Sequence, residues 1–442
     1  MKTFFFYDLE TSGLNPRADR IMQFAGQRTD MDLNPIGEPV NALVKMTEDA
    51  LPSPGAIGVT GITPQQTLAD GMSEAKFAEF VTEEIFTPNT VAVGYNTVRF
   101  DDEFMRALFW RNFYDPYEFE WKDGRSRWDM LDVVRLTRAL RPEGINWPFT
   151  EDGKPTNRLE LLTKMNGLSH EHAHDALSDV YATIAVAKLI RDKQPELFKF
   201  LFGMRGKNDV KKLVNLDDKK PFVYASGRYN NEFNKTTVVF PLTAGRNGNI
   251  LVYDLRYNIE EVNKESMFPI VKELCLNKCP AVAPLGVLEK DDGWEKIGLS
   301  REKVQENLKK LLEHPEFAEK MREEREKEED FPPAEEPEAA IYEGFLNEPD
   351  RVKAAAVRNA DEDRLADFHP GFDDARLADL LLHYKGRNYP RALAADEMEK
   401  WEEYRKARIE KQAPKFLAEL ETLKQKDEFL AQELYLYFES LC

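Results

Sequence analysis

Apolar residues in the first part of the chain form short runs that alternate with longer amphipathic stretches. The aromatic-rich run 3–7 leads into the polar stretch Asp8–Gly13, which predicts a buried strand followed by a turn. A second strand is predicted at 90–95. Three stretches have apolar residues at helical spacing: 74–86, 102–112 and 176–190. Strands that alternate with helices predict an α/β domain, and we place its end near Pro195.

The pattern changes after this domain. Short β-type runs separated by Gly and Asn clusters predict a small β-barrel or sheet, and they cover 222–224, 236–240 and 250–253. Next comes the stretch 319–330, in which only Met321 is uncharged, and we interpret it as a solvated helix and connector rather than a binding tail. Helical spacing from about Asp350 onward predicts an all-α domain. We therefore expect three domains, over 1–195, 196–348 and 349–442.

Composition limits how the protein can bind other molecules. Its 80 acidic and 61 basic residues give a net charge of −19, so overall charge would not hold it to a nucleic acid. Any such contact must come from a local basic or aromatic groove. The three cysteines, Cys275, Cys279 and Cys442, are too few for a disulfide framework and form a poor zinc signature.

The sequence also bears on the compartment. The first apolar run is stopped by Asp8, which makes it too short for a signal peptide. No apolar run approaches the length of a membrane span. We expect a soluble, cytoplasmic protein with no membrane partner.

Two carboxylates follow the first predicted strand. Asp8 and Glu10 are two residues apart, so they point to the same face of a strand. Like charges this close raise each other's pKa unless a cation neutralises them, and hard divalent cations prefer oxygen ligands. Two solvated acids at a strand end are the alternative, but the apolar run before them indicates a central strand.

A third candidate acid begins the predicted helix after the second strand. Asp101 is our ligand candidate, because it directly follows the strand–loop segment that ends at Phe100. Asp102 and Glu103 are expected to cap the helix, since acids are favoured at a helix N-terminus.

Three of the six histidines cluster just before the last helix of the α/β domain. A zinc site formed by His170, His172 and His174 is conceivable, but no thiolate lies near, and the alternation suits a polar loop equally well. His174 stands five residues before Asp179, a spacing that suits a loop or helix start leaning over a metal held by Asp179. We therefore select His174 and Asp179.

These residue types match one reaction. Two cations about 3.5–4 Å apart can stabilise both the attacking and the leaving oxygen in phosphodiester hydrolysis. Four carboxylates could hold them, and a histidine can accept the proton of the attacking water because its pKa lies near neutrality.

The order Asp-x-Glu, Asp, His-x4-Asp resembles the DEDDh 3′–5′ exonuclease superfamily, and the chain closely resembles the bacterial exodeoxyribonuclease I family within it. The stretches that carry this likeness are 6–13, 94–96, 99–103, 112–117, 141–148 and 174–176, with thinner matches at 277–280 and 384–390. The resemblance implies a ribonuclease H-like α/β exonuclease domain, an SH3-like β-barrel domain and a C-terminal all-α domain. Together these would enclose a groove for single-stranded DNA.

The same resemblance implies a set of functional residues. Asp8, Glu10, Asp101 and Asp179 would bind two Mg²⁺ ions, with Mn²⁺ as a substitute, and His174 would be the general base. Glu10 would also touch substrate, and the remaining implied DNA contacts are Arg158, Arg106, Tyr117, Trp121, Arg135 and Lys207. Aromatic rings stack on bases and cations neutralise phosphates, although Tyr117 and Trp121 could instead be ordinary core residues.

The resemblance further implies a partner and a role. The partner is the acidic C-terminal tail of single-stranded DNA-binding protein, the chain is expected to act as a monomer, and the pathways are DNA repair and recombination. Other possibilities are an RNA-directed DEDDh exonuclease, a proofreading subunit, or a catalytically silent adaptor that binds single-stranded DNA. The two extra domains argue against the first two, and the complete set of catalytic residues argues against the adaptor.

Overall fold

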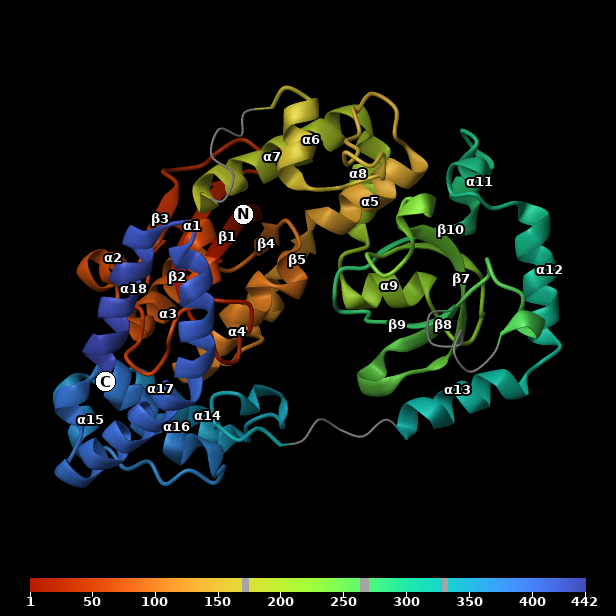
Figure 1. Ribbon diagram of the computed structural model, residues 1–442. Coiled ribbons are helices and arrows are strands. Elements are labelled where there is room, and N and C mark those ends of the chain that lie inside the picture. Colours follow the sequence, from red (N-terminus) through yellow and green to blue (C-terminus); the bar gives the residue numbers. More distant parts are fainter. Residues whose placement is uncertain (169–174, 263–269, 328–332) are drawn as a thin grey trace.

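The computed structural model describes residues 1–168, 175–262, 270–327 and 333–442. Over these residues the chain forms two five-stranded sheets and a helical C-terminal part. The first sheet and the C-terminal helices lie together on one side of the molecule, and the second sheet lies on the other (Figure 1). The α/β, β and all-α parts therefore follow each other in the expected order.

Five strands form the first sheet: β1 (Thr3–Thr11), β2 (Ile21–Thr29), β3 (Val40–Leu43), β4 (Thr90–Gly94) and β5 (Ser126–Asp129). Their order is β3-β2-β1-β4-β5, so the aromatic strand β1 is central. β1 runs antiparallel to β2, with Asp8 opposite Ala25, and parallel to β4, with Phe4 opposite Val91. A mixed sheet results, because β4 and β5 are also parallel.

Helices cover this sheet on both faces. They are α1 (Pro54–Thr60), α2 (Pro64–Asp70), α3 (Glu74–Phe80), α4 (Asp101–Arg111), α5 (Met130–Leu140), α6 (Leu159–Met165), α7 (Ala176–Lys193) and α8 (Pro195–Gly203). The next helix, α9 (Lys207–Leu213), packs on the second sheet instead. A π-helical turn, Val81–Ile85, extends α3. The three helical stretches expected from the sequence are confirmed as α3 with this turn, α4 and α7.

Alternate side chains of β1 enter two different cores. Phe4 and Phe6 pack in the cluster that contains Val133 of α5 and Val180 of α7. Phe5 and Tyr7 belong to the cluster on the opposite face, with residues of α3 and α4. The period of two along a strand therefore places Asp8 and Glu10 on the α5 and α7 face.

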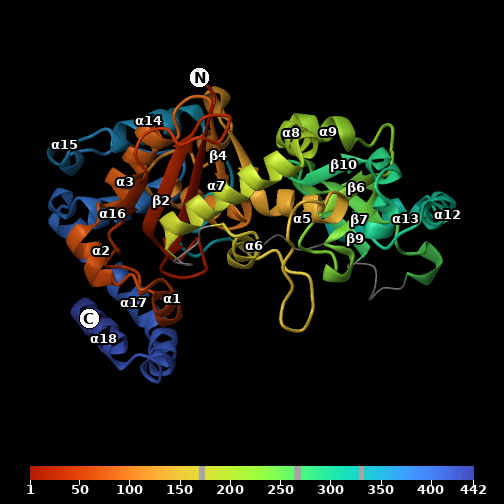
Figure 2. The ribbon, with the colours of Figure 1, turned by 90° about the horizontal axis from the view of Figure 1, so that it is seen from above.

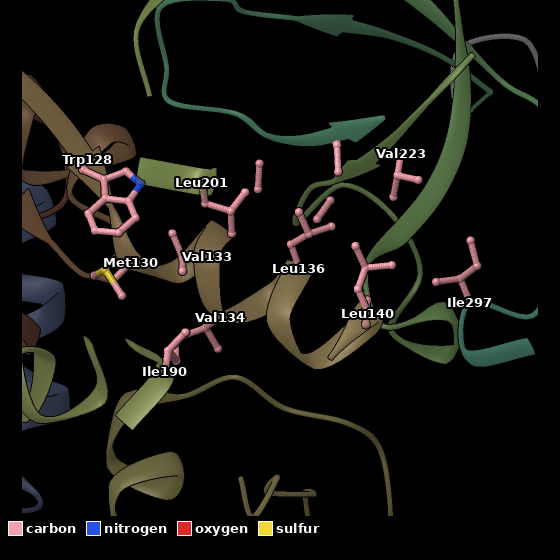
Figure 3. Packing of buried hydrophobic residues seen from close by; sticks show 14 of the residues in the cluster. Trp128, Met130, Val133, Val134, Leu136, Leu140, Ile190, Leu201, Val223 and Ile297 are labelled. Carbon is pink, nitrogen blue, oxygen red and sulfur yellow. The ribbon is translucent and has the colours of Figure 1, made fainter. Parts of the chain in front are cut away.

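Helix α5 joins the two sheets through one hydrophobic core. Its apolar side chains contact Trp128, Ile190 and Leu201 on one side, and Val223 and Ile297 on the other (Figure 3). Only a helix that is buried nearly all round can do this, and α5 is buried at most of its positions. The shared core fixes the second sheet relative to the first.

The second sheet is entirely antiparallel, with the order β10-β6-β7-β8-β9. Its strands are β6 (Phe222–Ala225), β7 (Thr236–Ala244), β8 (Ile250–Asp254), β9 (Val271–Leu274) and β10 (Ala281–Pro284). The helices that follow are α11 (Gly293–Lys296), α12 (Arg301–Leu312) and α13 (Glu316–Glu326). Met321, the one uncharged residue of the charged stretch, is fully buried, so α13 docks on the sheet through its apolar positions.

The C-terminal part contains α14 (Glu348–Arg358), α15 (Glu362–Ala366), α16 (Arg376–Asn388), α17 (Ala395–Lys424) and α18 (Glu428–Leu441). α17 and α18 pack against α1 (Figure 2). A buried charge cluster adds to this contact: Asp49 and Glu338 both accept hydrogen bonds from Arg20 and Arg408. None of the described helices combines the length and the apolar composition that a membrane span needs.

Candidate active site

Strand β1 presents Asp8 and Glu10 beyond the point where its pairing with β4 stops. The parallel register ends at Phe6 opposite Val93, so the last part of β1 is free of that neighbour. Both carboxylates are half-buried. They lie on the same face of β1 as Phe4 and Phe6, which is the placement expected from their spacing.

Asp179 reaches the same place from the first turn of α7. This helix packs on β1 and β2, and the Asp175 side chain caps it by accepting a hydrogen bond of 3.0 Å from the Ser178 backbone N–H. One carboxylate oxygen each from Asp8, Glu10 and Asp179 lie within 4.8 Å of one another. The structure thus brings together three acids, although more than 160 residues of sequence separate Asp8 from Asp179.

Asp101 lies beside this group on the edge of β1. It is buried, and its carboxylate accepts a hydrogen bond of 3.1 Å from the backbone N–H of Leu9. That N–H is available because β4 no longer pairs with β1 at this point. The fourth predicted acid is therefore attached to the strand that carries the first two.

The acids raise one another's pKa. Burial raises the pKa of Asp8 well above its usual range, and the charges of Asp101, Asp179 and Glu10 raise it further. Burial, followed by the charges of Asp179 and Asp175, raises the pKa of Glu10 to about 8. Burial and the charge of Asp102 likewise raise the pKa of Asp101.

A cation would relieve this repulsion. The donors are all carboxylate oxygens, the ligands that Mg²⁺ and similar hard cations prefer. The donor set and the spacing of its oxygens therefore fit a divalent cation.

The predicted general base cannot be placed from the structure. His170, His172 and His174 lie outside the described residues. The described chain resumes at Asp175, the N-cap of α7, directly after His174. The choice of His174 among the three histidines stays a prediction.

The expectation that Asp102 and Glu103 cap α4 is wrong. Phe100 occupies the N-cap position and forms no side-chain capping bond. Asp102 is buried and accepts hydrogen bonds of 2.5 Å from the Tyr7 hydroxyl and from Arg127. Glu103 pairs with Arg106 and Lys278. The physical reason is the buried Arg127 guanidinium of β5, which requires a carboxylate partner.

A cleft of about 410 Å³ opens beside the acids, within the range of about 300–1,000 Å³ typical of ligand sites. Asp8 and Asp179 line it together with Tyr95 and Arg158 of the first part of the chain. Lys235, from the segment before β7, lines it as well. The cleft therefore lies between the two sheet-containing parts.

Two of the basic residues implied by the family resemblance line this cleft. Arg158 is well exposed and pairs with Glu160 at 2.5 Å. Arg135 of α5 is mostly buried and pairs with Asp132 at 2.6 Å. Lys207 is exposed at the start of α9, outside the cleft lining.

Arg106, Tyr117 and Trp121 form a separate region. Arg106 is buried between Glu103 and Glu120, at 3.0 and 2.6 Å, and its guanidinium lies 5.3 Å from the centre of the Tyr117 ring. Its charge is thus already neutralised within the protein. Trp121 is 64% exposed, so it is not a core residue.

The sequence did not suggest Lys235 or Asn231 as cleft residues. Both belong to the connection between β6 and β7, where Asn234 and Lys235 have positive φ values of 50° and 58°. The asparagines signal a turn. Nothing in the sequence places that turn beside Asp8, because the contact depends on how α5 holds the two sheets.

Comparisons with known proteins cover all three parts of the chain. A family model described as "Exonuclease" matches residues 5–187. The model "Exonuclease I SH3-like domain" matches 205–270 and 260–325, and "Exonuclease I C-terminal domain" matches 335–441. The two fold types expected from the resemblance for the β and helical parts are thereby confirmed.

Similar proteins extend over the whole length. Exodeoxyribonuclease I of Haemophilus influenzae is 41% identical over 444 residues, which cover 95% of this chain and 93% of that protein. The structure of Escherichia coli Exonuclease I in complex with a dA16 oligonucleotide matches with a TM-score of 0.94 and 38% identity, over 100% of both chains. A structure of SSB/Exonuclease I in complex with the inhibitor CFAM matches with a TM-score of 0.92 and 38% identity, again over 100% of both.

Proposed function

Because this chain belongs to the bacterial exodeoxyribonuclease I family, we propose that it hydrolyses single-stranded DNA from the 3′ end and releases 5′-mononucleotides. The observation that carries the proposal is the carboxylate group of Asp8, Glu10 and Asp179, two of which line a cleft with Arg135 and Arg158. The carboxylates can bind a divalent metal, and the arginines beside them can bind the phosphates of a nucleic-acid substrate.

Asp8, Glu10, Asp101 and Asp179 would hold two Mg²⁺ ions, with Mn²⁺ as a substitute. The mutual repulsion of these acids supports the assignment, since each pKa described for the group is raised. When bound, such cations stabilise negative charge on the scissile phosphate and on the leaving 3′ oxygen.

His174 would accept the proton of the attacking water. A histidine is suited to this step because its ordinary pKa of about 6.5 leaves it largely neutral at pH 7. Its place in the chain, directly before the cap of the helix that carries Asp179, supports the assignment. Glu10 would in addition contact the terminal nucleotide.

The basic and aromatic residues implied by the family resemblance would hold the DNA strand. Arg158 and Arg135 would neutralise phosphates near the reacting bond, and Lys207 would do so further along the strand. Tyr117 and Trp121 would stack on bases without regard to sequence. Arg106 would act mainly by holding the Tyr117 ring, because Glu103 and Glu120 already neutralise its charge.

The net charge of −19 supports a substrate that must enter a cleft. An excess of acidic residues repels nucleic acid, so binding depends on places where cations or aromatic rings gather, among them the cleft that contains Arg135, Arg158 and Lys235. A single strand can pass into this region and expose its phosphates and bases to it.

We further propose the cellular setting. The protein would act as a cytoplasmic monomer in DNA repair and recombination, and would bind the C-terminal tail of single-stranded DNA-binding protein. The likeness to the SSB/Exonuclease I structure supports the partner.

Digestion of matched DNA and RNA oligonucleotides tests the proposal. With Mg²⁺, a 5′-labelled DNA strand should shorten stepwise from its 3′ end, the RNA strand should remain largely intact, and EDTA should stop the reaction. Digestion of RNA alone would overturn the substrate assignment. Undiminished activity in EDTA would overturn the metal assignment.

A further inference from the structure

Two cations meet at Gly227, between β6 and β7. The Lys235 ammonium donates a hydrogen bond of 3.1 Å to the Gly227 carbonyl. The Arg135 guanidinium lies against the same residue, so closely that a Cβ on Gly227 would stand 2.9 Å from its Nη2 atom. A glycine here therefore allows an arginine of α5 and a lysine of the β6–β7 connection to approach each other.

The two cations are not fully neutralised by the protein. Asp132 accepts from Arg135 at 2.6 Å and is shared with Arg99 at 2.7 Å, although Arg99 also has Asp129 at 4.0 Å. Lys235 forms no ion pair within the described parts of the chain. Positive charge therefore remains at the edge of a cleft that also contains Asp8 and Asp179.

The backbone of Lys235 is unusual for a lysine. Its φ of 58° follows a φ of 50° at Asn234, so two consecutive residues adopt the left-handed conformation. Glycine and asparagine occupy this region with the least strain, whereas a lysine there is strained. Strained residues concentrate at functional sites, where the side chain is needed for something other than stability.

We propose that Lys235 and Arg135 form a two-cation site for one backbone phosphate of the bound DNA strand. The site lies in the cleft, where α5 and the β6–β7 connection meet, and it rests on the proposed function. Burial, together with the charge of Arg135, lowers the pKa of Lys235, and a phosphate between the two cations would remove that repulsion. In this way the β6–β7 connection of the second sheet would hold the DNA strand beside the carboxylates of the first sheet.

Lys235→Asn tests the site without adding strain, because asparagine tolerates the left-handed conformation. Lys220→Asn is the matched control, since Lys220 is 78% exposed on the same part of the chain and does not line the cleft. Lys235→Arg keeps the charge. Affinity for a fluorescent single-stranded oligonucleotide would be measured in EDTA at several salt concentrations, together with the thermal unfolding midpoint.

We expect Lys235→Asn to weaken binding about tenfold, the size of one charged hydrogen bond. The slope of log affinity against log salt should fall by about 0.7, the value for one phosphate on a single strand. The unfolding midpoint should not decrease. Lys235→Arg should restore most of the affinity, and Lys220→Asn should behave like the unchanged protein.

A single neutral methylphosphonate linkage, moved along the oligonucleotide, identifies the phosphate. At one position it should weaken binding to the unchanged protein strongly and binding to Lys235→Asn less, because only Arg135 still contacts that phosphate in the variant. Equal sensitivity of both proteins at every position would overturn the site.

Inhibition by a deoxynucleoside 5′-monophosphate shows whether the site binds the DNA strand or the released nucleotide. If Lys235→Asn weakened only inhibition by this nucleotide and left strand affinity unchanged, the site would belong to the product and the proposal would be wrong. Failure of the unchanged protein to bind or digest single-stranded DNA would instead overturn the proposed function.

Discussion

The backbone N–H of Leu9 donates a hydrogen bond of 3.1 Å to the carboxylate of Asp101. This bond fastens the start of α4 to the strand that carries Asp8 and Glu10. The site consequently depends on the early end of the β1–β4 ladder, which leaves the Leu9 N–H free to make it.

Substitution of His174 should separate catalysis from binding. His174→Ala should lower turnover by about 10²–10⁴-fold, the usual contribution of a general base, while affinity for single-stranded DNA stays nearly unchanged. His170→Ala and His172→Ala serve as matched controls and should have mild effects. Turnover and oligonucleotide affinity measured on all three variants check this. If His172→Ala were the inactive variant, the assignment of the base would be wrong.

Stability of the metal-free protein should fall as pH rises. The folded protein holds a proton on Glu10 up to a pKa of about 8, whereas its ordinary value is 4.5. The stabilising contribution is therefore complete below pH 4.5 and is lost as pH rises to about 8, by at most about 1.4 kcal/mol per unit. Urea unfolding in EDTA from pH 5 to 8 measures it.

Glu10→Gln should make this pH dependence shallower, because the glutamine cannot ionise. Mg²⁺ should flatten the curve of the unchanged protein, since a bound cation stabilises the charged acids. Parallel curves for Glu10→Gln and the unchanged protein would contradict the electrostatic description of the site.

The buried ion pair behind the site should be essential for folding. Arg127→Met should reduce the free energy of unfolding by about 3–5 kcal/mol, because it leaves Asp102 buried without its cation, whereas Glu120 keeps Arg106. Lys122→Met removes an exposed ion pair with Glu118 and should cost less than about 1 kcal/mol. Equilibrium urea unfolding compares the two. Equal losses would show that the Arg127 pair is no more important than a surface pair.

Trp121 should contribute to binding without contributing to stability. Trp121→Ala should weaken single-stranded DNA affinity by about 5–150-fold, equivalent to the 1–3 kcal/mol of one stacked base. Phe429→Ala is the control, because Phe429 is also exposed but lies on α18 of the C-terminal part. Fluorescence anisotropy and thermal unfolding test both variants. A lowered unfolding temperature with unchanged affinity would assign Trp121 a structural role instead.

The sequence was informative where the relevant contact is local. The period of two along β1 was sufficient to place Asp8 and Glu10 on one face, and helical spacing identified α4 and α7. The same reasoning failed for Asp102. A local rule favoured a helix cap, whereas the true partners, Tyr7 and Arg127, are distant in sequence.

The helix α5 shows why the relation between the parts could not be predicted. It is buried at most of its positions, including the polar Asp132 and Arg138, so its hydrophobic pattern does not say which side faces which sheet. The position of Lys235 beside Arg135 depends on that orientation. Family resemblance supplied Arg106 as a position on the DNA path, but it did not show that two glutamates already neutralise this residue.

The location of the metal ions relative to the DNA end tests the central claim most directly. Crystals would be grown with Mn²⁺ and a single-stranded oligonucleotide whose last linkage resists hydrolysis, and anomalous diffraction would locate the metal. We predict manganese bound by Asp8, Glu10, Asp101 and Asp179, with the 3′-terminal phosphodiester beside it. Manganese bound elsewhere, or a 5′ end at these carboxylates, would contradict the account.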